Sequence, residues 1–338
     1  MVMLGIMASG ITKSKLLSYL AVAHGTSPYI TAYPWSAGFG TKYSNPATLP
    51  AGTGYGIAFN PSQTALAIAF SGVPRIAAYP WSSAGFGTKY TDPASYPDSD
   101  ASSVAFSPAG TTIAVSNNLS PYIHTYPWSA GFGTRYAAPS PATADTHSVA
   151  FNAASNTIAL AAQNGTGFAL YPWSAGFGTK YADPATVPTS STQSVAFNMA
   201  DNTIAVANAA SPFIFTYPFT PGTGIGTKYS NPATLPPNYA TSVTFNPAGT
   251  VVAVAHATTP FITAYPWSAG FGTKYANPAT LLSGSGTGVS FKPDGTDIAV
   301  SSGASPYIVA YPWSAGFGTK YADPATLPTG IGNSVSFI

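Results

Sequence analysis

Hydrophobic residues alternate with small or polar ones in short runs along most of the chain. Runs such as TTIAVS (111–116) and YITAY (29–33) have the period of two that is typical of β-strands. Turn sequences such as NPAG (246–249) separate the runs, with proline fixing φ and glycine accepting a positive φ. Because no segment has a helical period, the pattern predicts an all-β protein built from short strands.

The strand pattern occurs seven times. A YPW or YPF motif begins at tyrosines spaced 45–48 residues apart, namely Tyr33, Tyr79, Tyr126, Tyr171, Tyr217, Tyr265 and Tyr311. A second landmark, the phenylalanine that ends each SVAF-like run, precedes the next of these tyrosines by 20 residues in all six cases. Four short strands in such a unit are typical of a propeller blade. The sequence therefore predicts a seven-bladed β-propeller with four-stranded antiparallel blades.

The two ends of the chain predict how the ring closes. The first unit lacks its SVAF-like strand, and the chain ends with such a strand, SVSFI (334–338), which no further unit follows. We expect the C-terminal strand to complete the first blade, which would leave no open sheet edge between the ends. The expected organisation is an N-terminal extension (1–15) and a propeller (16–338).

The segment KSKLLSYLAVAHG (13–25) has the charged and apolar regions of a signal peptide. Its second half aligns with VAVAHATTPFITAYPW (252–267) from inside the repeat array, so we expect residues 20–24 to form a strand and no export signal to remain. The methionine-rich start MVMLGIM (1–7) suits either a docking peg or a frayed end.

The units resemble those of WD-repeat proteins. VAFSPAGTTIAVS (104–116) and VSFKPDGTDIAVS (289–301) are similar to the first two strands of a WD-repeat blade, and YITAYPW (29–35) stands where that family has its third strand and Trp-Asp pair. The resemblance covers residues 16–338 and implies the propeller fold. Since the family's Gly-His and Trp-Asp pairs are missing, its hydrogen-bond network is not carried over.

Composition excludes several functions. Only 6% of residues are charged, the net charge is +2, and there is no cysteine. Clustered lysine and arginine, which nucleic-acid binding needs, are absent, as are thiolate metal sites and disulfides. No apolar run approaches the roughly 18 residues of a membrane helix, so no membrane insertion is expected.

Two residue types recur once per unit. Six units carry an aromatic residue that suits packing between blades or, alternatively, a ring of sugar-binding platforms in a lectin: Trp35, Trp81, Trp128, Trp173, Trp267 and Trp313. Every unit carries one basic residue: Lys42, Lys89, Arg135, Lys180, Lys228, Lys274 and Lys320. We interpret these cations as charges that protect an exposed edge strand from pairing, with an anion-binding ring as the alternative.

Other positions vary between units. One set suggests an exposed, variable loop-end surface: His24, Phe70, Asn117, Asn208 and His256. The stretches after each Asx-Pro turn, such as 47–56, 94–103 and 140–147, differ most and are predicted to carry specificity. No carboxylate pair, histidine dyad or metal-ligand cluster is evident, so the sequence predicts no catalytic residues, no metal site, no cofactor and no enzyme.

Highly similar repeats, the lack of cysteine and the low charge resemble phage and environmental viral propeller proteins. That resemblance implies a non-enzymatic structural or docking protein of a virion, such as a capsid or tail, made in the host cytoplasm and bound to other virion proteins. One alternative is a multivalent lectin that binds surface glycans, in an extracellular location. A second alternative is an intracellular WD-repeat-type scaffold with protein partners.

Overall fold

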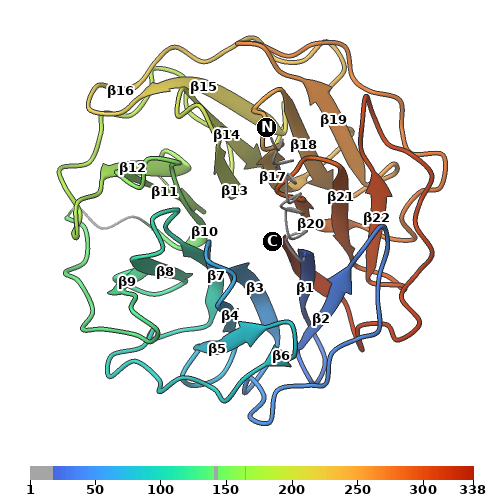
Figure 1. Ribbon diagram of the computed structural model, residues 1–338. Coiled ribbons are helices and arrows are strands. Elements are labelled where there is room, and N and C mark those ends of the chain that lie inside the picture. The colour runs from blue at the N-terminus through green and yellow to red at the C-terminus, as the bar shows by residue number, and fades with distance from the viewer. Residues whose placement is uncertain (1–17, 141–143, 164) are drawn as a thin grey trace, which may run out of the picture.

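The computed structural model describes residues 18–140, 144–163 and 165–338. Their strands form seven separate antiparallel sheets that surround a central axis as blades (Figure 1). The predicted all-β, seven-bladed propeller is thereby confirmed. We number the blades I to VII along the chain, beginning with the blade that contains β1. Within these residues no helix is long and apolar enough to cross a membrane.

Each blade contains three strands at increasing distance from the axis (Figure 1). The innermost strands, from blade I to blade VII, are β23 (Gly332–Phe337), β3 (Gly54–Phe59), β7 (Ala101–Phe106), β10 (Thr146–Phe151), β13 (Thr192–Phe197), β17 (Ala240–Phe245) and β20 (Gly286–Phe291). The second strands are β1 (Ser18–His24), β4 (Ala65–Phe70), β8 (Thr112–Asn117), β11 (Thr157–Ala162), β14 (Thr203–Asn208), β18 (Val251–His256) and β21 (Asp297–Ser302). The third strands are β2 (Ile30–Trp35), β5 (Ile76–Ser82), β9 (Ile123–Pro127), β12 (Phe168–Pro172), β15 (Ile214–Thr220), β19 (Ile262–Pro266) and β22 (Ile308–Pro312).

A fourth strand exists only in blades II and V, as β6 (Gly85–Phe86) and β16 (Gly224–Ile225). In the other five blades one isolated bridge, such as Trp35 to Phe39, takes its place. Loop length explains the difference. Blade II has an inserted serine. Trp81 therefore pairs with Phe86, and Ser82 pairs with Gly85, so that a two-residue hairpin loop joins the two strands. One residue fewer leaves room for only one pair, so the prediction of four strands in every blade was too regular.

The C-terminal strand completes blade I, as predicted. β23 pairs with β1 in antiparallel register, with Leu20 opposite Phe337 and Val22 opposite Val335. Backbone bonds between Tyr19 and Ile338 extend the ladder in both directions, at 2.9 and 3.0 Å. The expected strand at residues 20–24 is confirmed within β1. The N-terminal extension (1–15), with its proposed docking peg, lies outside the described residues.

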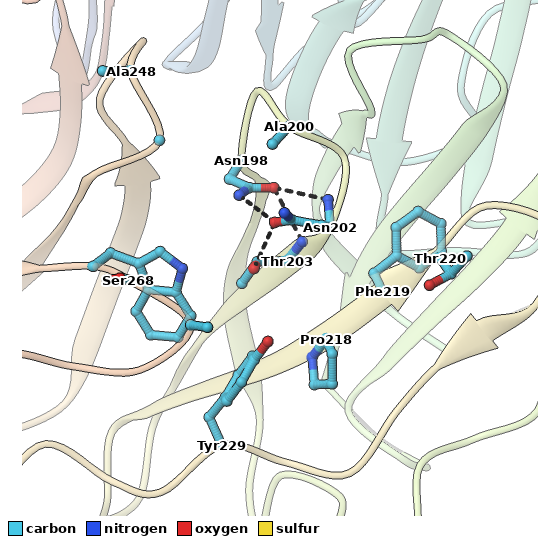
Figure 2. A pocket seen from close by; sticks show the side chains of 13 residues that line it. Asn198, Ala200, Asn202, Thr203, Pro218, Phe219, Thr220, Tyr229, Ala248 and Ser268 are labelled. Carbon is cyan, nitrogen blue, oxygen red and sulfur yellow. Dashed lines mark hydrogen bonds between the residues drawn. The ribbon is translucent and has the colours of Figure 1, made fainter.

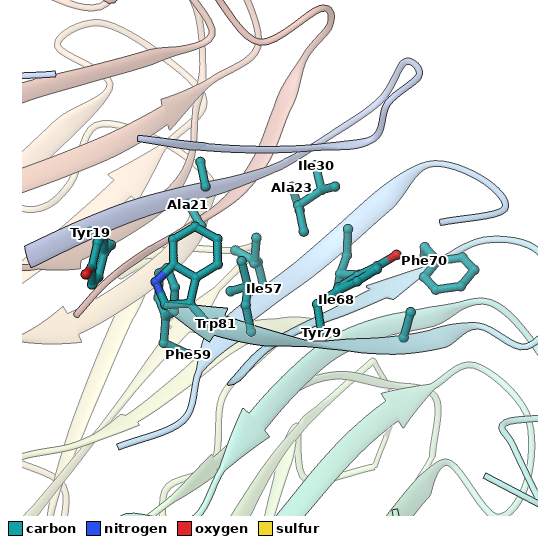
Figure 3. Packing of buried hydrophobic residues seen from close by; sticks show 13 residues of the cluster. Tyr19, Ala21, Ala23, Ile30, Ile57, Phe59, Ile68, Phe70, Tyr79 and Trp81 are labelled. Atoms are coloured by element: carbon teal, nitrogen blue, oxygen red, sulfur yellow. The ribbon is translucent and has the colours of Figure 1, made fainter. Parts of the chain in front are cut away.

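Hydrophobic side chains fill the spaces between neighbouring blades. Figure 3 shows the interface between blades I and II, where Tyr19 and Ala21 of β1 face Ile57, Phe59 and Trp81. The rings of Tyr19 and Trp81 meet edge to face with centroids 5.4 Å apart, which is a favoured geometry for aromatic pairs. Each blade is therefore stabilised by contact with the next.

The tyrosine of the YPW motif also joins neighbouring blades. All seven of these tyrosines are fully buried, so each hydroxyl needs a hydrogen-bond partner. Tyr79 of blade II donates to the carbonyl oxygen of Thr48, in the segment after blade I, at 2.8 Å. Five more make the equivalent bond at 2.6–2.8 Å: Tyr33, Tyr126, Tyr217, Tyr265 and Tyr311. The repeated motif thus holds the shape of the ring.

Candidate functional site on the propeller axis

A pocket of about 440 Å³ lies on the axis of the ring. All seven innermost strands contribute to its wall, each through its second residue: Tyr55, Ser102, His147, Gln193, Thr241, Thr287 and Asn333. Asp100 and Asn118 of blade III complete the lining. The volume is in the range of small-molecule sites, and every lining residue carries a polar group in its side chain. We call the seven strand residues the axial ring.

Four members of the axial ring hydrogen-bond to the next blade. His147, Thr241, Thr287 and Asn333 each reach the backbone carbonyl of the first residue in the neighbouring innermost strand, at 3.1, 2.6, 2.5 and 2.8 Å respectively. In blades III and V the ring residue bonds within its own blade instead. Ser102 donates to Asn118 Oδ1 at 2.9 Å, and Gln193 Nε2 donates to Ser191 Oγ at 2.8 Å. These bonds hold the polar wall in a defined arrangement.

His147 is oriented as a proton acceptor. Its Nδ1 lies 3.1 Å from the carbonyl oxygen of Thr192, and because a carbonyl only accepts, Nδ1 carries the proton of the neutral ring. Nε2 is therefore the atom with a free electron pair. Asp145 Oδ1 lies 3.9 Å from Nε2. That oxygen is buried and has no hydrogen-bond partner among the described residues. The carboxylate therefore lies near the acceptor nitrogen, while the backbone carbonyl of Thr192 orients the ring.

Among the described residues, the pocket is lined by an acidic side chain but by no lysine or arginine. Asp100 is exposed in its wall, and Asp145 stands beside His147. Among the residues that the structure describes, no group of three or more His, Cys, Asp or Glu side chains could hold a metal ion. The chemistry available here is proton transfer by one histidine and hydrogen bonding by hydroxyl and amide groups.

A second pocket, of about 400 Å³, lies between blades V and VI (Figure 2). Its polar groups already satisfy one another. Asn198 Oδ1 accepts the backbone N–H groups of Asn202 and Thr203 at 3.1 and 3.0 Å, and Asn198 Nδ2 donates to Asn202 Oδ1 at 2.7 Å. Asn152 of blade IV makes the same turn. This pocket is thus lined by elements that other blades repeat, so we place the functional site on the axis.

The six tryptophans lie between blades and not on an open surface. Their exposed fractions are 4–6%. Trp81, for example, meets the rings of Tyr43, Phe59 and Phe86 edge to face at 5.0–5.2 Å. Trp35, Trp128, Trp173, Trp267 and Trp313 have equivalent contacts. The packing interpretation agrees with this burial, which leaves little indole surface for a sugar to stack on.

The set interpreted as an exposed loop-end surface is buried, so that expectation was wrong. His24, Phe70, Asn117, Asn208 and His256 have exposed fractions of 0–1%. Each ends a second strand, and its backbone N–H is bonded across the following hairpin, as in His24 to the carbonyl of Tyr29 at 2.9 Å. These side chains are therefore not part of an open surface. Burial lowers the pKa of His24 and His256 to about 4, and that of His124 likewise.

The repeated cations lie in the segment after the third strand. Lysines at this position bond the side-chain oxygen of the Asn or Asp three residues later, as in Lys42 to Asn45 at 2.6 Å and Lys228 to Asn231 at 2.5 Å. Lys89 and Lys320 form ion pairs with Asp92 and Asp323 in the same way. The charges are thus engaged in local turns on the periphery of the ring, and a protective role for them stays a prediction.

Sequence reasoning missed the axial ring, although the signal for it is present. Each ring residue stands four positions before the phenylalanine that ends its SVAF-like run. Seven near-identical units carry six different residue types at this position, Tyr, Ser, His, Gln, Thr and Asn. The variable stretches 47–56, 94–103 and 140–147 do end at the ring, and they contain Tyr55, Asp100, Ser102 and His147. To tell which of the variable residues face the axis, one must know how each strand is oriented in the ring.

Seven blades of three or four antiparallel strands define the chain as a seven-bladed β-propeller. No protein-family model matches the sequence, and no curated protein matches it. Solved structures do match. A putative 6-phosphogluconolactonase from Bacteroides fragilis has a TM-score of 0.74 at 10% identity, with 97% of this chain and 99% of that chain covered. The periplasmic gluconolactonase of Pseudomonas aeruginosa has a TM-score of 0.72 at 13% identity, with 95% and 99% covered. A putative 6-phosphogluconolactonase from Bacteroides uniformis has a TM-score of 0.68 at 11% identity, with 95% and 99% covered.

At such identities the likeness establishes the seven-bladed propeller fold alone, which these neighbours share. It also corrects the functional prediction. A non-enzymatic docking protein of a bacteriophage virion is contradicted by neighbours whose names are those of lactonases. The same names contradict the prediction that the chain is not an enzyme, and they leave the lectin and scaffold alternatives without support. The similarity of the repeats and the low charge led to the wrong functional prediction because both reflect how the ring is built. The residues that line the pocket, in contrast, differ from one unit to the next.

Proposed function

We propose that the protein is a hydrolase that opens a lactone ring in the axial pocket, with His147 as the general base. One observation carries the proposal. The bond from His147 Nδ1 to the Thr192 carbonyl leaves Nε2 as a proton acceptor inside a polar pocket, with a carboxylate 3.9 Å away. The lactonase names of the structural neighbours support this class of reaction.

The reaction needs one water molecule and no covalent intermediate. His147 Nε2 removes a proton from water as the oxygen attacks the lactone carbonyl carbon. The carboxylate of Asp145, 3.9 Å from Nε2, attracts the resulting imidazolium by its charge. When the ring C–O bond breaks, the imidazolium returns the proton to the departing alkoxide, which yields a hydroxy acid and the neutral base. The amide of Gln193 donates one hydrogen to Ser191 and keeps a second for the carbonyl oxygen as negative charge develops on it.

The decisive variant is His147→Asn. An asparagine at this ring position keeps the bond to the next blade, as Asn333 shows with its 2.8 Å bond to Gly54, but it has no basic nitrogen. We expect the catalysed rate of δ-gluconolactone hydrolysis, followed by proton release above the buffer rate, to fall by about 10²-fold or more. The melting temperature should change little.

The matched control is His256→Asn, because His256 lies outside the pocket and asparagine stands at the same place in blades III and V. It should keep the wild-type rate. A folded His147→Asn protein with an undiminished rate, or wild-type protein that does not accelerate lactone hydrolysis, would overturn the proposal.

A further inference from the structure

We infer that the axial pocket takes an uncharged, polyhydroxylated lactone and discriminates against a phosphorylated one. The inference rests on the proposed function and specifies its substrate class. It departs from what the names of two structural neighbours would suggest, since those names refer to a 6-phospho substrate. The inference is based on where the charged side chains of the described residues lie relative to the pocket.

A phosphate ester is normally bound by arginine or lysine side chains or by backbone N–H groups at a helix N-terminus. Within residues 18–140, 144–163 and 165–338, no lysine or arginine lines the pocket wall and no helix is present. His147 cannot substitute for a cation while it acts as a base, because its neutral form is the active one. The wall therefore lacks the groups that would compensate the two charges of a phosphate.

The cations that the structure describes are engaged elsewhere. Seven of them belong to the peripheral segments, where the lysines bond Asx side chains. Lys292 forms an ion pair with Asp294 directly after β20, at the opposite end of that strand from Thr287 of the ring. Arg75 donates through Nη1 to the carbonyl of Pro97 at 2.9 Å and is not part of the wall. None of these side chains lines the site.

Negative charge, in contrast, is present. Asp100 stands in the wall, and Asp145 lies beside the base. Like charges placed together in a binding site disfavour the wrong ligand strongly. The same field helps the product to leave, because ring opening turns a neutral lactone into a carboxylate anion.

The remaining wall residues suit hydroxyl groups. The hydroxyls of Ser102, Thr241 and Thr287 already donate their one hydrogen within the protein and offer acceptor lone pairs. The side-chain amides of Gln193 and Asn333 each keep a second hydrogen that a ligand can accept. Tyr55, with 38% of its surface exposed, presents an aromatic ring at the edge of the pocket. Neutral donors and acceptors around the whole circumference match a small molecule that carries hydroxyl groups on several sides.

The test compares δ-gluconolactone with its 6-phosphate on the full chain. We expect kcat/KM for the uncharged lactone to exceed that for the phosphate by about tenfold or more. Gln193→Lys places a cation in the wall and should reduce this preference at least about fivefold. Thr41→Lys adds the same charge beside the peripheral Lys42, on an exposed residue, and should leave the preference unchanged.

Equal or better turnover of the 6-phosphate by the wild-type protein overturns the inference while leaving the hydrolase proposal intact. If neither lactone is hydrolysed, the hydrolase proposal fails, and calorimetric titration with the same two probes then decides the inference alone. Tighter binding of δ-gluconolactone supports it. Tighter or equal binding of the 6-phosphate, or binding of neither compound, overturns it.

Discussion

Removal of residues 334–338 should destabilise the whole ring. A chain that ends at Asn333 keeps the complete axial ring but loses most of β23, which is the innermost strand of blade I in the described part of the chain. The pairs that join Val335 and Phe337 to β1 disappear, as do the two backbone bonds between Tyr19 and Ile338. The deletion therefore opens the ring where the two ends of the chain meet.

The magnitude follows from these contacts. Val335 and Phe337 have exposed fractions of 7% and 6%, and burying two such side chains stabilises by roughly 3–6 kcal/mol. The Phe337 ring also meets Trp35 at 5.0 Å. Backbone groups of β1 that lose their partners cost about 1–3 kcal/mol each where they stay buried. The sum rivals a typical domain stability of about 5–15 kcal/mol.

Thermal unfolding followed by circular dichroism tests this expectation. We expect the melting temperature to fall by at least about 10 °C, or the truncated chain to aggregate. Adding a peptide of residues 330–338 in trans should restore part of the loss by strand addition, and Ser336→Ala, which keeps the strand, should have little effect. A truncated protein that melts within about 2 °C of the full chain would show that β23 does not close the ring energetically.

Two further changes probe the stability of the same ring. Asp297→Thr introduces the residue that blades III, IV and V carry at this position, but it removes the carboxylate that accepts hydrogen bonds from Trp35 Nε1 (3.1 Å) and Tyr321 Oη (2.6 Å). The free energy of unfolding, measured in urea, should fall by about 1–3 kcal/mol. Asp297→Asn should recover part of this loss. Lowering the pH from 7 to 5 should destabilise the protein by about 2 kcal/mol for each of the buried histidines His24, His124 and His256, because the unfolded chain binds protons below about pH 6.5 and the folded chain only near pH 4. His256→Asn should reduce this dependence, and an unchanged dependence in that variant would contradict the burial of His256.

The architecture was predictable because the same physical contacts occur in every blade. The YPW motif supplies a buried tyrosine that donates a hydrogen bond to the segment after the preceding blade, as Tyr79 does. It also supplies a tryptophan that packs against the same segment, as Trp81 does against Tyr43. A contact that must form between each pair of neighbours has to appear once per unit, so its spacing reports the blade. Loop length was harder to interpret, since a single inserted serine decides whether the fourth strand forms.

The direction of a variable side chain was not predictable from its position in the repeat. His256 and Thr241 belong to the same blade, both positions vary between units, and the two residues lie at the same end of adjacent strands. His256 ends a second strand and is buried, whereas Thr241 is the second residue of an innermost strand and lines the pocket. The two residues differ by one strand in their distance from the axis, and this difference decides whether the side chain packs in the core or lines the pocket. Only the three-dimensional arrangement shows which residue lies on which strand.

Repetition itself helps to locate function in this chain. Seven units that pack in the same way need the same residues wherever blades touch. The repeated sequence motif therefore explains the fold and does not explain ligand binding. A ligand on the axis meets all seven units at once but is not sevenfold symmetric. Positions that face it are therefore free to differ, and a single unit can supply the base. His147 is the only histidine in the axial ring, and Asp145 lies two residues before it, so the base that we propose and its neighbouring carboxylate both come from blade IV.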